Sequence, residues 1–344
     1  MFWGQNKIRL TYIFRLTLAE PTLGCVMIKF TRSRIGRCLP VVVAALAGIG
    51  LVACGGGGEQ GGSADDGKVF VVATTGMVGD MVRAVGGPGV EVKQLMGATI
   101  DPHSFKPELK DTTAMGRADL IFYSGLLLEG KMEQQWSSHA DKSHAVAEGI
   151  PGERLDGDDG HPDPHVWGDV ALWSKGIDGV VAAFAKIDPD GADGYRERGE
   201  AYRAKLADLH QWALGRAGEI PETNRVVITS HDAFSYFGKA YGFEVYGLQG
   251  ISTVGSFGAA DRAALAKIIR DRGVKTIFIE SSVNPDAIQG VAEDTGVKVS
   301  DVALFSDAMG VPGKIEEAGG EKYDVGTFEG MIKHNMNAIV DALK

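Results

Sequence analysis

A long helical segment separates two stretches of the chain that each alternate between strand-like and helix-like sequence. The segment 192–218 has no interior proline, and apolar residues such as Tyr195, Tyr202 and Leu209 recur in it at helical spacing. Pro221 ends it. At about 1.5 Å per residue the helix would be roughly 40 Å long, as long as a domain. We therefore expect an α/β protein in which two α/β lobes with mainly parallel sheets are joined by one long rigid connecting helix.

The stretch before this helix contains short apolar runs that are typical of buried strands, and these alternate with segments of helical spacing. The expected strands are 68–75, 90–96 and 118–124, and the expected helices are 77–85, 107–117 and 169–186. This alternation favours a parallel sheet with helices on its faces. We assign the first lobe to residues 68–189.

The same alternation resumes after the connecting helix, which we assign to residues 190–220. The expected strands are 225–230, 243–247, 274–280 and 297–302, and the expected helices are 234–241, 259–272, 285–295 and 327–343. The second lobe is therefore assigned to residues 221–344. No sequence repeat relates the two lobes.

Residues 1–53 have the character of a leader. Basic residues from Lys29 to Arg37 precede an apolar run, 39–52, and its 14 residues are too few to span a bilayer of about 30 Å. A signal peptide is the better interpretation. Residues 1–26 have no signal character, so we expect translation to start at Met27.

Cys54 ends the sequence Leu51-Val52-Ala53-Cys54, which resembles the bacterial lipobox, where the cysteine is lipidated and becomes the mature N-terminus. The alternative is an ordinary signal peptide with an incidental cysteine. Residues 54–67 are rich in glycine and acidic residues and predict a flexible tether. We therefore expect a lipoprotein outside the cytoplasm, anchored to a bacterial membrane in the periplasm or at the cell surface. No cysteine follows Cys54, so the lobes do not rely on disulfides.

The charge of the chain is unevenly distributed. Residues 1–53 hold seven of the 35 basic residues and one of the 45 acidic residues, so the remainder carries a net charge of −16. An acidic body argues against a general nucleic-acid binder, which needs a basic face for phosphates.

Three histidines and one aspartate are candidate metal ligands because of where they fall. His103 follows the second predicted strand, His231 ends the first strand of the second lobe, Asp307 follows the last strand, and His165 precedes the helical region 169–186. Ligands of open α/β sheets bind beyond the carboxyl ends of the strands. Three imidazoles and a carboxylate suit Zn²⁺, and also Mn²⁺ if the carboxylate is bidentate. Separations of 62, 66 and 76 residues match no short metal motif, so spacing alone leaves each residue open to a surface or core role.

Residues 68–344 resemble the solute-binding proteins of zinc/manganese ABC importers, the TroA-like (cluster A-I) family. The matching blocks are, in order, DPHSFKP (101–107), GLLLEGKM (125–132), DPHVW (163–167), TSHDAFSYFGKAYG (229–242), QGIST (249–253), IFIESSVNP (277–285) and LFSDAMG (304–310).

This resemblance implies two lobes on one rigid helix, with a metal ion held between them. Carried over position by position, the ligands are His103, His165, His231 and Asp307. Manganese-selective members often have Glu at the position of His231, so histidine there is more similar to the zinc or mixed members. The implied partner is the membrane permease of a metal ABC importer, and we expect a monomer.

Two blocks depart from the family pattern. Leu127 stands where GLHLE of the family has histidine, a position outside the four implied ligands. The residues after QGIST, 254–258, lack the usual acidic character, so the cleft surface or transporter docking differs there. The acidic stretch around Asp156, Asp158, Asp159, His161 and Asp163 is interpreted as a solvated loop, with weak gathering of cations as the alternative.

Other side chains near the candidate ligands have expected supporting roles. Glu280 ends a predicted strand, and we expect its carboxylate to orient a ligand histidine through the second ring nitrogen. Trp167 and Phe305 flank the ligands and either exclude water from the site or simply pack. Four histidines without a motif are taken as structural: His139, His144, His210 and His334.

The expected function is capture rather than catalysis. The protein would bind Zn²⁺, alternatively Mn²⁺ and less favourably Fe²⁺, and deliver it to the importer. One alternative is a zinc-dependent hydrolase with Glu280 as base, although no HExxH-type motif is present. The other is a siderophore- or haem-binding protein of similar architecture. A second use as an adhesin stays open.

Overall fold

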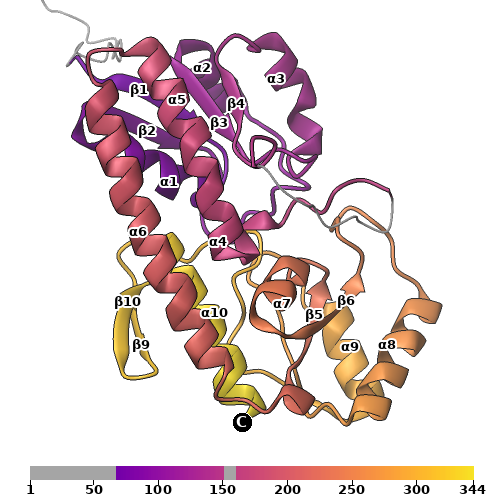
Figure 1. Cartoon of the computed structure of the whole chain (residues 1–344). Coiled ribbons are helices and arrows are strands. Elements are labelled where there is room, and N and C mark those ends of the chain that lie inside the picture. The colour runs from indigo at the N-terminus through magenta and orange to yellow at the C-terminus, as the bar shows by residue number, and fades with distance from the viewer. Residues whose placement is uncertain (1–66, 151–159) are drawn as a thin grey trace, which may run out of the picture. The chain divides into compact units, whose positions relative to one another are not determined.

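The computed structural model describes residues 67–150 and 160–344 (Figure 1). The leader, Cys54 and nearly all of the tether lie outside the described residues, as do Asp156, Asp158 and Asp159. The described residues belong to one compact unit of the chain.

The first lobe is built on a parallel sheet of four strands in the order β2-β1-β3-β4. The strands are β1 (Val69–Ala73), β2 (Val90–Gln94), β3 (Leu120–Tyr123) and β4 (Ser143–Ala145). The helices are α1 (Gly76–Gly86), α2 (Leu109–Arg117), α3 (Glu133–Ser138), α4 (Val170–Trp173) and α5 (Ile177–Ile187). Successive residues of a strand point to opposite faces, so Val71 packs in one apolar cluster and Val72 in another. A sheet covered on both faces explains why its central strands, β1 and β3, are continuous apolar runs.

The connecting helix is α6 (Ala192–Ala217), and it runs alongside helices of both lobes (Figure 1). It packs against α1, α4 and α5 of the first lobe and α7 and α10 of the second. Its buried residues, among them Tyr202, Leu206 and Leu209, belong to the apolar cluster that contains Val71 of β1 and Met336 of α10. The apolar residues whose spacing predicted the helix are therefore the residues by which α6 packs against both lobes.

The second lobe contains shorter strands. They are β5 (Val226–His231), β6 (Glu244–Gln249), β7 (Thr276–Ile277), β8 (Lys298–Val299), β9 (Ile315–Ala318) and β10 (Glu321–Asp324). The pairs β5–β6 and β7–β8 are parallel, and the N–H of Phe278 donates to the carbonyl of Ile228 at 2.8 Å between them. The helices are α7 (Ser235–Tyr241), α8 (Ala259–Arg272), α9 (Asp286–Thr295) and α10 (Phe328–Leu343).

The expected fold class is confirmed, with local differences in the elements. The helical region 169–186 is divided into α4, a 3-10 turn (Ser174–Gly176) and α5. The runs 274–280 and 297–302 form only two ladder pairs, followed by a single bridge between Glu280 and Leu304. Three features were not predicted from the sequence: helix α3, strand β4 and the antiparallel hairpin β9–β10.

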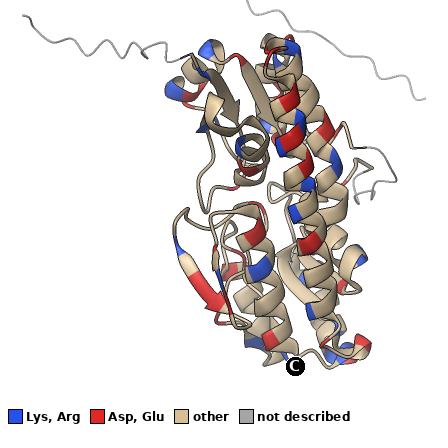
Figure 2. Cartoon of the chain, turned by 60° about the vertical axis from the view of Figure 1, so that its left-hand side comes forward, with Lys and Arg blue, Asp and Glu red and all other residues tan. Residues whose placement is uncertain are grey.

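Basic and acidic residues are interspersed along the helices in the view of Figure 2. Within the described ranges, no helix combines the length and the apolar character needed to cross a membrane.

Candidate metal centre

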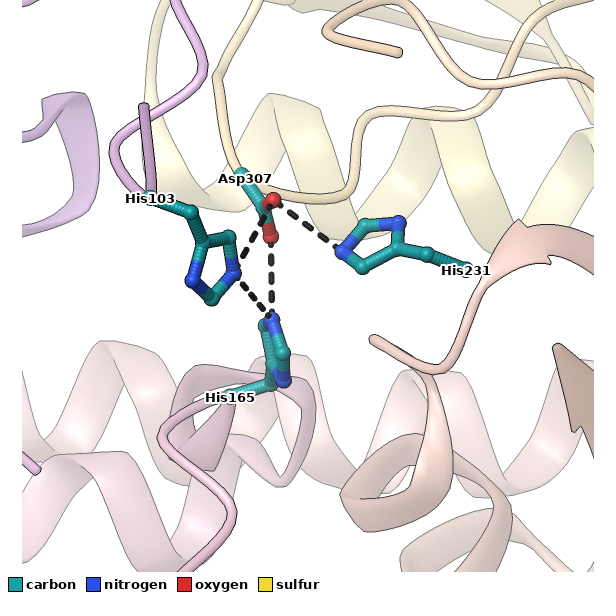
Figure 3. A group of neighbouring side chains, drawn as sticks. All are labelled: His103, His165, His231 and Asp307. Atoms are coloured by element: carbon teal, nitrogen blue, oxygen red, sulfur yellow. Dashed lines mark hydrogen bonds and ion pairs between the residues drawn. The ribbon is translucent and has the colours of Figure 1, made fainter. Parts of the chain in front are cut away.

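The four candidate ligands come from loops and strand ends that meet between the lobes. His103 follows β2, His165 precedes the 3-10 turn Val166–Gly168, and His231 is the last residue of β5. Asp307 follows Leu304, which forms the bridge with Glu280. All four are buried, with exposed fractions of 5%, 0%, 0% and 1%. Figure 3 shows their side chains converging on one point.

The geometry of this group suits a metal ion. One ligand atom from each residue lies within 4.8 Å of all the others. The Nε2 atom of His165 lies 3.4 Å from Nε2 of His103 and 3.3 Å from Oδ1 of Asp307. Oδ2 of Asp307 lies 3.1 Å from Nε2 of His231 and 3.7 Å from Nε2 of His103. Metal–ligand bonds of about 2.1 Å in a tetrahedron would put ligand atoms about 3.4 Å apart, so these separations fit Zn²⁺.

The carboxylate of Asp307 supports this fit. Among the described residues, neither of its oxygens has a hydrogen-bond partner of good geometry, although both face imidazoles at ion-pair distance. A buried carboxylate is costly unless a cation compensates it. A divalent ion between Asp307 and the three Nε2 atoms would supply that charge.

His165 is oriented by a carboxylate that the sequence interpretation placed in a solvated loop. Asp163 is 1% exposed, so that interpretation is wrong for this residue. Its Oδ1 lies 2.7 Å from Nδ1 of His165 and also accepts the His165 backbone N–H at 2.9 Å. Nδ1 is thereby engaged and Nε2 faces the other ligands.

Glu280 has the corresponding position beside His231. Its Oε2 lies 2.5 Å from Nδ1 of His231, and its Oε1 accepts the His231 backbone N–H at 2.9 Å. This is the contact expected from the sequence, and it also directs Nε2 of His231 to the centre. Glu280 itself is not among the four grouped ligands.

The charges of the group separate its imidazoles into two kinds. Burial, together with the neighbouring imidazoles, lowers the pKa of His103 to about 4. Burial acts against the charged form of His165 too, but Asp163 and Asp307 outweigh it and raise its pKa to about 9. Against the same burial penalty, Glu280 and Asp307 raise the pKa of His231, and the two imidazoles hold the pKa of Asp307 well below its usual range. The raised pKa values of His165 and His231 favour the protonated imidazoles, whose positive charges compensate the carboxylate of Asp307 when no metal ion is bound.

The two Asp-Pro-His motifs share a local turn. In each, the aspartate accepts the backbone N–H of the histidine two residues later, at 2.9 Å for both Asp101 and Asp163. The second oxygen of Asp101 instead accepts the hydroxyl of Thr253 at 2.7 Å. Thr253 belongs to the second lobe, so this hydrogen bond joins the lobes beside His103. The repeated motif was the available signal for these roles.

The aromatic residues differ in their relation to the site. The ring of Trp167 lies 5.3 Å from that of His165, and its Nε1 donates to the carbonyl of Ser306, next to Asp307, at 3.0 Å. Phe305 packs on His334, with ring centroids 4.3 Å apart. Leu127 is 53% exposed and lies outside the grouped ligands.

The remaining histidines have local partners, in keeping with structural roles. Nδ1 of His334 lies 2.7 Å from Oε2 of Glu316, and its Nε2 lies 2.8 Å from the carbonyl of Ala303. His210 contacts the hydroxyl of Tyr241, His139 contacts the carbonyl of Gln135, and the ring of His144 packs on Phe122.

Known proteins resemble this chain over most of its length. A family profile described as zinc-uptake complex component A, periplasmic, matches residues 71–342. The manganese-binding lipoprotein MntA of Bacillus subtilis is 39% identical over 294 residues, which cover 84% of this chain and 94% of MntA. The zinc-binding protein TroA of Treponema pallidum is 40% identical over 284 residues, which cover 82% of this chain and 91% of TroA.

The solved structure of the periplasmic zinc-binding protein TroA of Treponema pallidum aligns with a TM-score of 0.75 at 39% identity. The alignment covers 80% of this chain and 99% of the TroA chain. The fold, the profile and the relatives agree with one another. The chain therefore belongs to the zinc-uptake component A (TroA-like) family, the metal-binding solute-binding proteins of ABC importers.

Proposed function

We propose that this protein captures Zn²⁺ with His103, His165, His231 and Asp307 and delivers it to an ABC importer. The observation that carries the proposal is the convergence of four buried ligand atoms, none more than 4.8 Å from another. One relative is named as a zinc-binding protein and the other as a manganese-binding lipoprotein, which supports the class of ion.

Capture suits this centre better than catalysis. Four protein ligands fill a tetrahedral zinc site and leave no open position for an activated water, which a zinc hydrolase needs. Glu280, the residue that such an enzyme would use as base, is instead committed to the ring and backbone N–H of His231.

Zinc is the ion we favour, with Mn²⁺ as the alternative and Fe²⁺ behind both. Three imidazoles and a carboxylate are ligands that Zn²⁺ prefers. Both oxygens of Asp307 face imidazoles, so a bidentate carboxylate would also give Mn²⁺ a fifth ligand atom.

Delivery requires the protein to work outside the cytoplasm, next to a membrane permease. We propose that Cys54 carries the lipid anchor, that residues 55–67 form the tether, and that the mature protein is a monomer with lobes bounded at 68–189 and 221–344. Mass spectrometry of the mature N-terminal peptide tests the anchor: a diacylglyceryl-modified Cys54 is expected, and an unmodified cysteine would contradict it.

Calorimetric titration of the metal-free protein tests the ligand set. The wild type is expected to bind one Zn²⁺ per chain. His231→Ala is expected to lose more than the roughly tenfold to hundredfold that removal of an orienting group costs, because a ligand itself is lost. His139→Ala is the matched control, because the ring of His139 contacts the carbonyl of Gln135 and lies outside the four candidate ligands. Unchanged zinc affinity in His231→Ala would refute the assignment.

Metal analysis of protein purified from its native host, paired with competition between Zn²⁺ and Mn²⁺, tests the choice of ion. Predominant zinc is expected. Predominant manganese would overturn the preference while leaving the capture function in place.

A further inference from the structure

A pocket of about 530 Å³ adjoins the metal centre at the carboxyl ends of β5 and β6. Its walls include residues next to three of the four ligands. Ser230 precedes His231 and Asp101 lies two residues before His103. The hydroxyl of Ser282 lies 3.2 Å from that of Ser306, which precedes Asp307. The pocket therefore reaches the surroundings of the proposed ligands from one side.

Two buried polar atoms in the wall of this pocket have no partner in the part of the chain that the structure describes. The side chain of Ser230 is almost fully buried, with 2% of the residue exposed, and its Oγ makes no hydrogen bond there. Gln249 is half-buried, but its Oε1 is buried and also makes no hydrogen bond there; Gln249 pairs with His231 between β6 and β5. A buried hydrogen-bonding atom without a partner is costly, so rotation of these two side chains toward a ligand that donates hydrogen bonds would be favoured here.

The charges of the pocket point to a cationic donor. Its wall carries the carboxylates of Asp101 and Asp286 and one guanidinium, that of Arg262. That guanidinium already donates to Asp294 at 2.7 Å. Acceptor oxygens therefore dominate the wall, whereas anions would find little free positive charge.

We propose that this pocket is a staging site for the hydrated divalent cation, which it holds through its water ligands before the ion reaches His103, His165, His231 and Asp307. The waters of a hydrated Zn²⁺ or Mn²⁺ are strong hydrogen-bond donors, and they match the acceptors Gln249 Oε1, Ser230 Oγ and the carboxylates. The volume leaves room for an ion that still keeps its first hydration shell. This inference rests on the proposed capture function and adds a route to it.

The hydrogen bond between Thr253 and Asp101 lies at the boundary between this pocket and His103. Both residues line the pocket, and Asp101 also holds the turn that presents His103. The staging site and the ligand loop therefore share one carboxylate, by which an arriving cation would act on the loop.

Stopped-flow kinetics with Zn²⁺ test the staging site, with the fluorescence of Trp167 beside His165 as the signal. The variants are Ser230→Ala, Gln249→Leu and the two combined. Each removes an atom without a described partner, so thermal unfolding is expected to stay close to that of the wild type. Ser143→Ala is the matched control, because Ser143 also has a buried hydroxyl without a described partner but lies in β4.

The combined variant is expected to slow both association and dissociation about tenfold, as two lost hydrogen bonds would, with little change in Kd. Groups that contact the ion only on its way cannot change the equilibrium, so both rates must fall together. Wild-type rates in the combined variant would overturn the staging site, as would a weaker Kd caused by faster dissociation alone. Absence of Zn²⁺ binding to the wild type would instead contradict the proposed function itself.

Discussion

Individual carboxylates decide how the imidazoles of this protein are presented. Asp163 and Glu280 each contact a ring Nδ1 and the backbone N–H of the same histidine, His165 or His231. The hydrogen bond from the backbone N–H fixes the loop, and the contact with Nδ1 fixes the tautomer of the ring. Each carboxylate therefore controls both where the imidazole lies and which ring nitrogen carries the proton. Glu316 makes the same ring contact to His334, away from the grouped ligands.

These contacts predict that Asp163→Asn and Glu280→Gln weaken zinc binding about tenfold to a hundredfold, as loss of an orienting carboxylate typically does. Calorimetric titration measures the affinity. Glu316→Gln, which alters the third carboxylate–imidazole pair, is expected to leave the affinity unchanged. Equal affinity in all three variants would mean that the contacts support the fold and not the ligands.

Protons would compete with a metal ion at the proposed ligands. The raised pKa values of His165, about 9, and of His231 mean that both rings are protonated in the metal-free protein at pH 7, whereas His103, at about 4, is already neutral. Metal binding must release those protons, so zinc affinity should fall as the pH is lowered below about 9. Titration in buffers of different ionisation enthalpy measures the protons released per ion. No dependence on the buffer at pH 7 would contradict these protonation states.

The convergence of the four candidate ligands could be predicted from the sequence, but the carboxylates beside them only in part. Each candidate ligand follows or precedes an apolar run, and the resemblance to the family implied that the four belong to one site. Asp163 was missed because it closes a run of acidic residues, which in sequence resembles a solvated loop. Only the tertiary structure shows that the Asp-Pro-His turn carries its carboxylate back onto its own histidine.

At the scale of elements, the turn after β3 combines strain with a buried carboxylate. Leu126 and Leu127 have φ values of 55° and 64°, in the left-handed region that favours glycine. Glu129 accepts the hydroxyl of Thr74 at 2.7 Å and the backbone N–H of Ser124 at 2.8 Å. These bonds hold the turn in a conformation that its leucines disfavour.

Leu127→Gly is expected to raise the free energy of unfolding by about 1 kcal/mol, because glycine relieves the strain and the lost side chain is 53% exposed. Leu126→Gly makes the same backbone change but removes a buried side chain, so a net loss of about 1 kcal/mol is expected. Urea unfolding compares the two. A destabilised Leu127→Gly variant would show that the turn is not strained.

Elements with strong periodic patterns were predictable, whereas those that depend on neighbours were not. The helix predicted for 259–272 has the bounds of α8, and α6 differs from its prediction by one residue. The run 274–280 has the sequence of one strand, but only Thr276, Ile277 and Glu280 have ladder partners. The hairpin β9–β10 carries the acidic residues Glu316, Glu317 and Glu321, which do not alternate with apolar ones as a half-buried strand would.

At the scale of the whole molecule, Asp80 joins three elements. It lies on α1 of the first lobe and accepts the hydroxyl of Tyr202 on α6 at 2.7 Å. It also accepts the backbone N–H of Phe328, the first residue of α10 in the second lobe. Lys205 of α6 pairs with Glu329, the next residue of α10, at 2.8 Å. These contacts fix the connecting helix against both lobes and limit changes in the angle between them.

Tyr202→Phe is expected to lower the free energy of unfolding by about 2 kcal/mol, because the partly buried carboxylate of Asp80 loses a donor. Tyr195→Phe is the matched control on the same helix, since its hydroxyl donates to Asp188 within the first lobe, at 2.8 Å, and its loss should cost about 1 kcal/mol. Chemical denaturation of the metal-free protein measures both. A larger loss for Tyr195→Phe would contradict the special role of the Asp80 joint.

The apolar cluster that extends from β1 through α6 to α10 limits which recombinants between related genes can fold. Each lobe also has an apolar cluster of its own, but this cluster draws on both, so a lobe exchanged between relatives would lose part of its core. A chimeric gene joined within α6 would have to match the buried stripe of one parent to the helices of both. Recombination should therefore preserve the two lobes and their helix together.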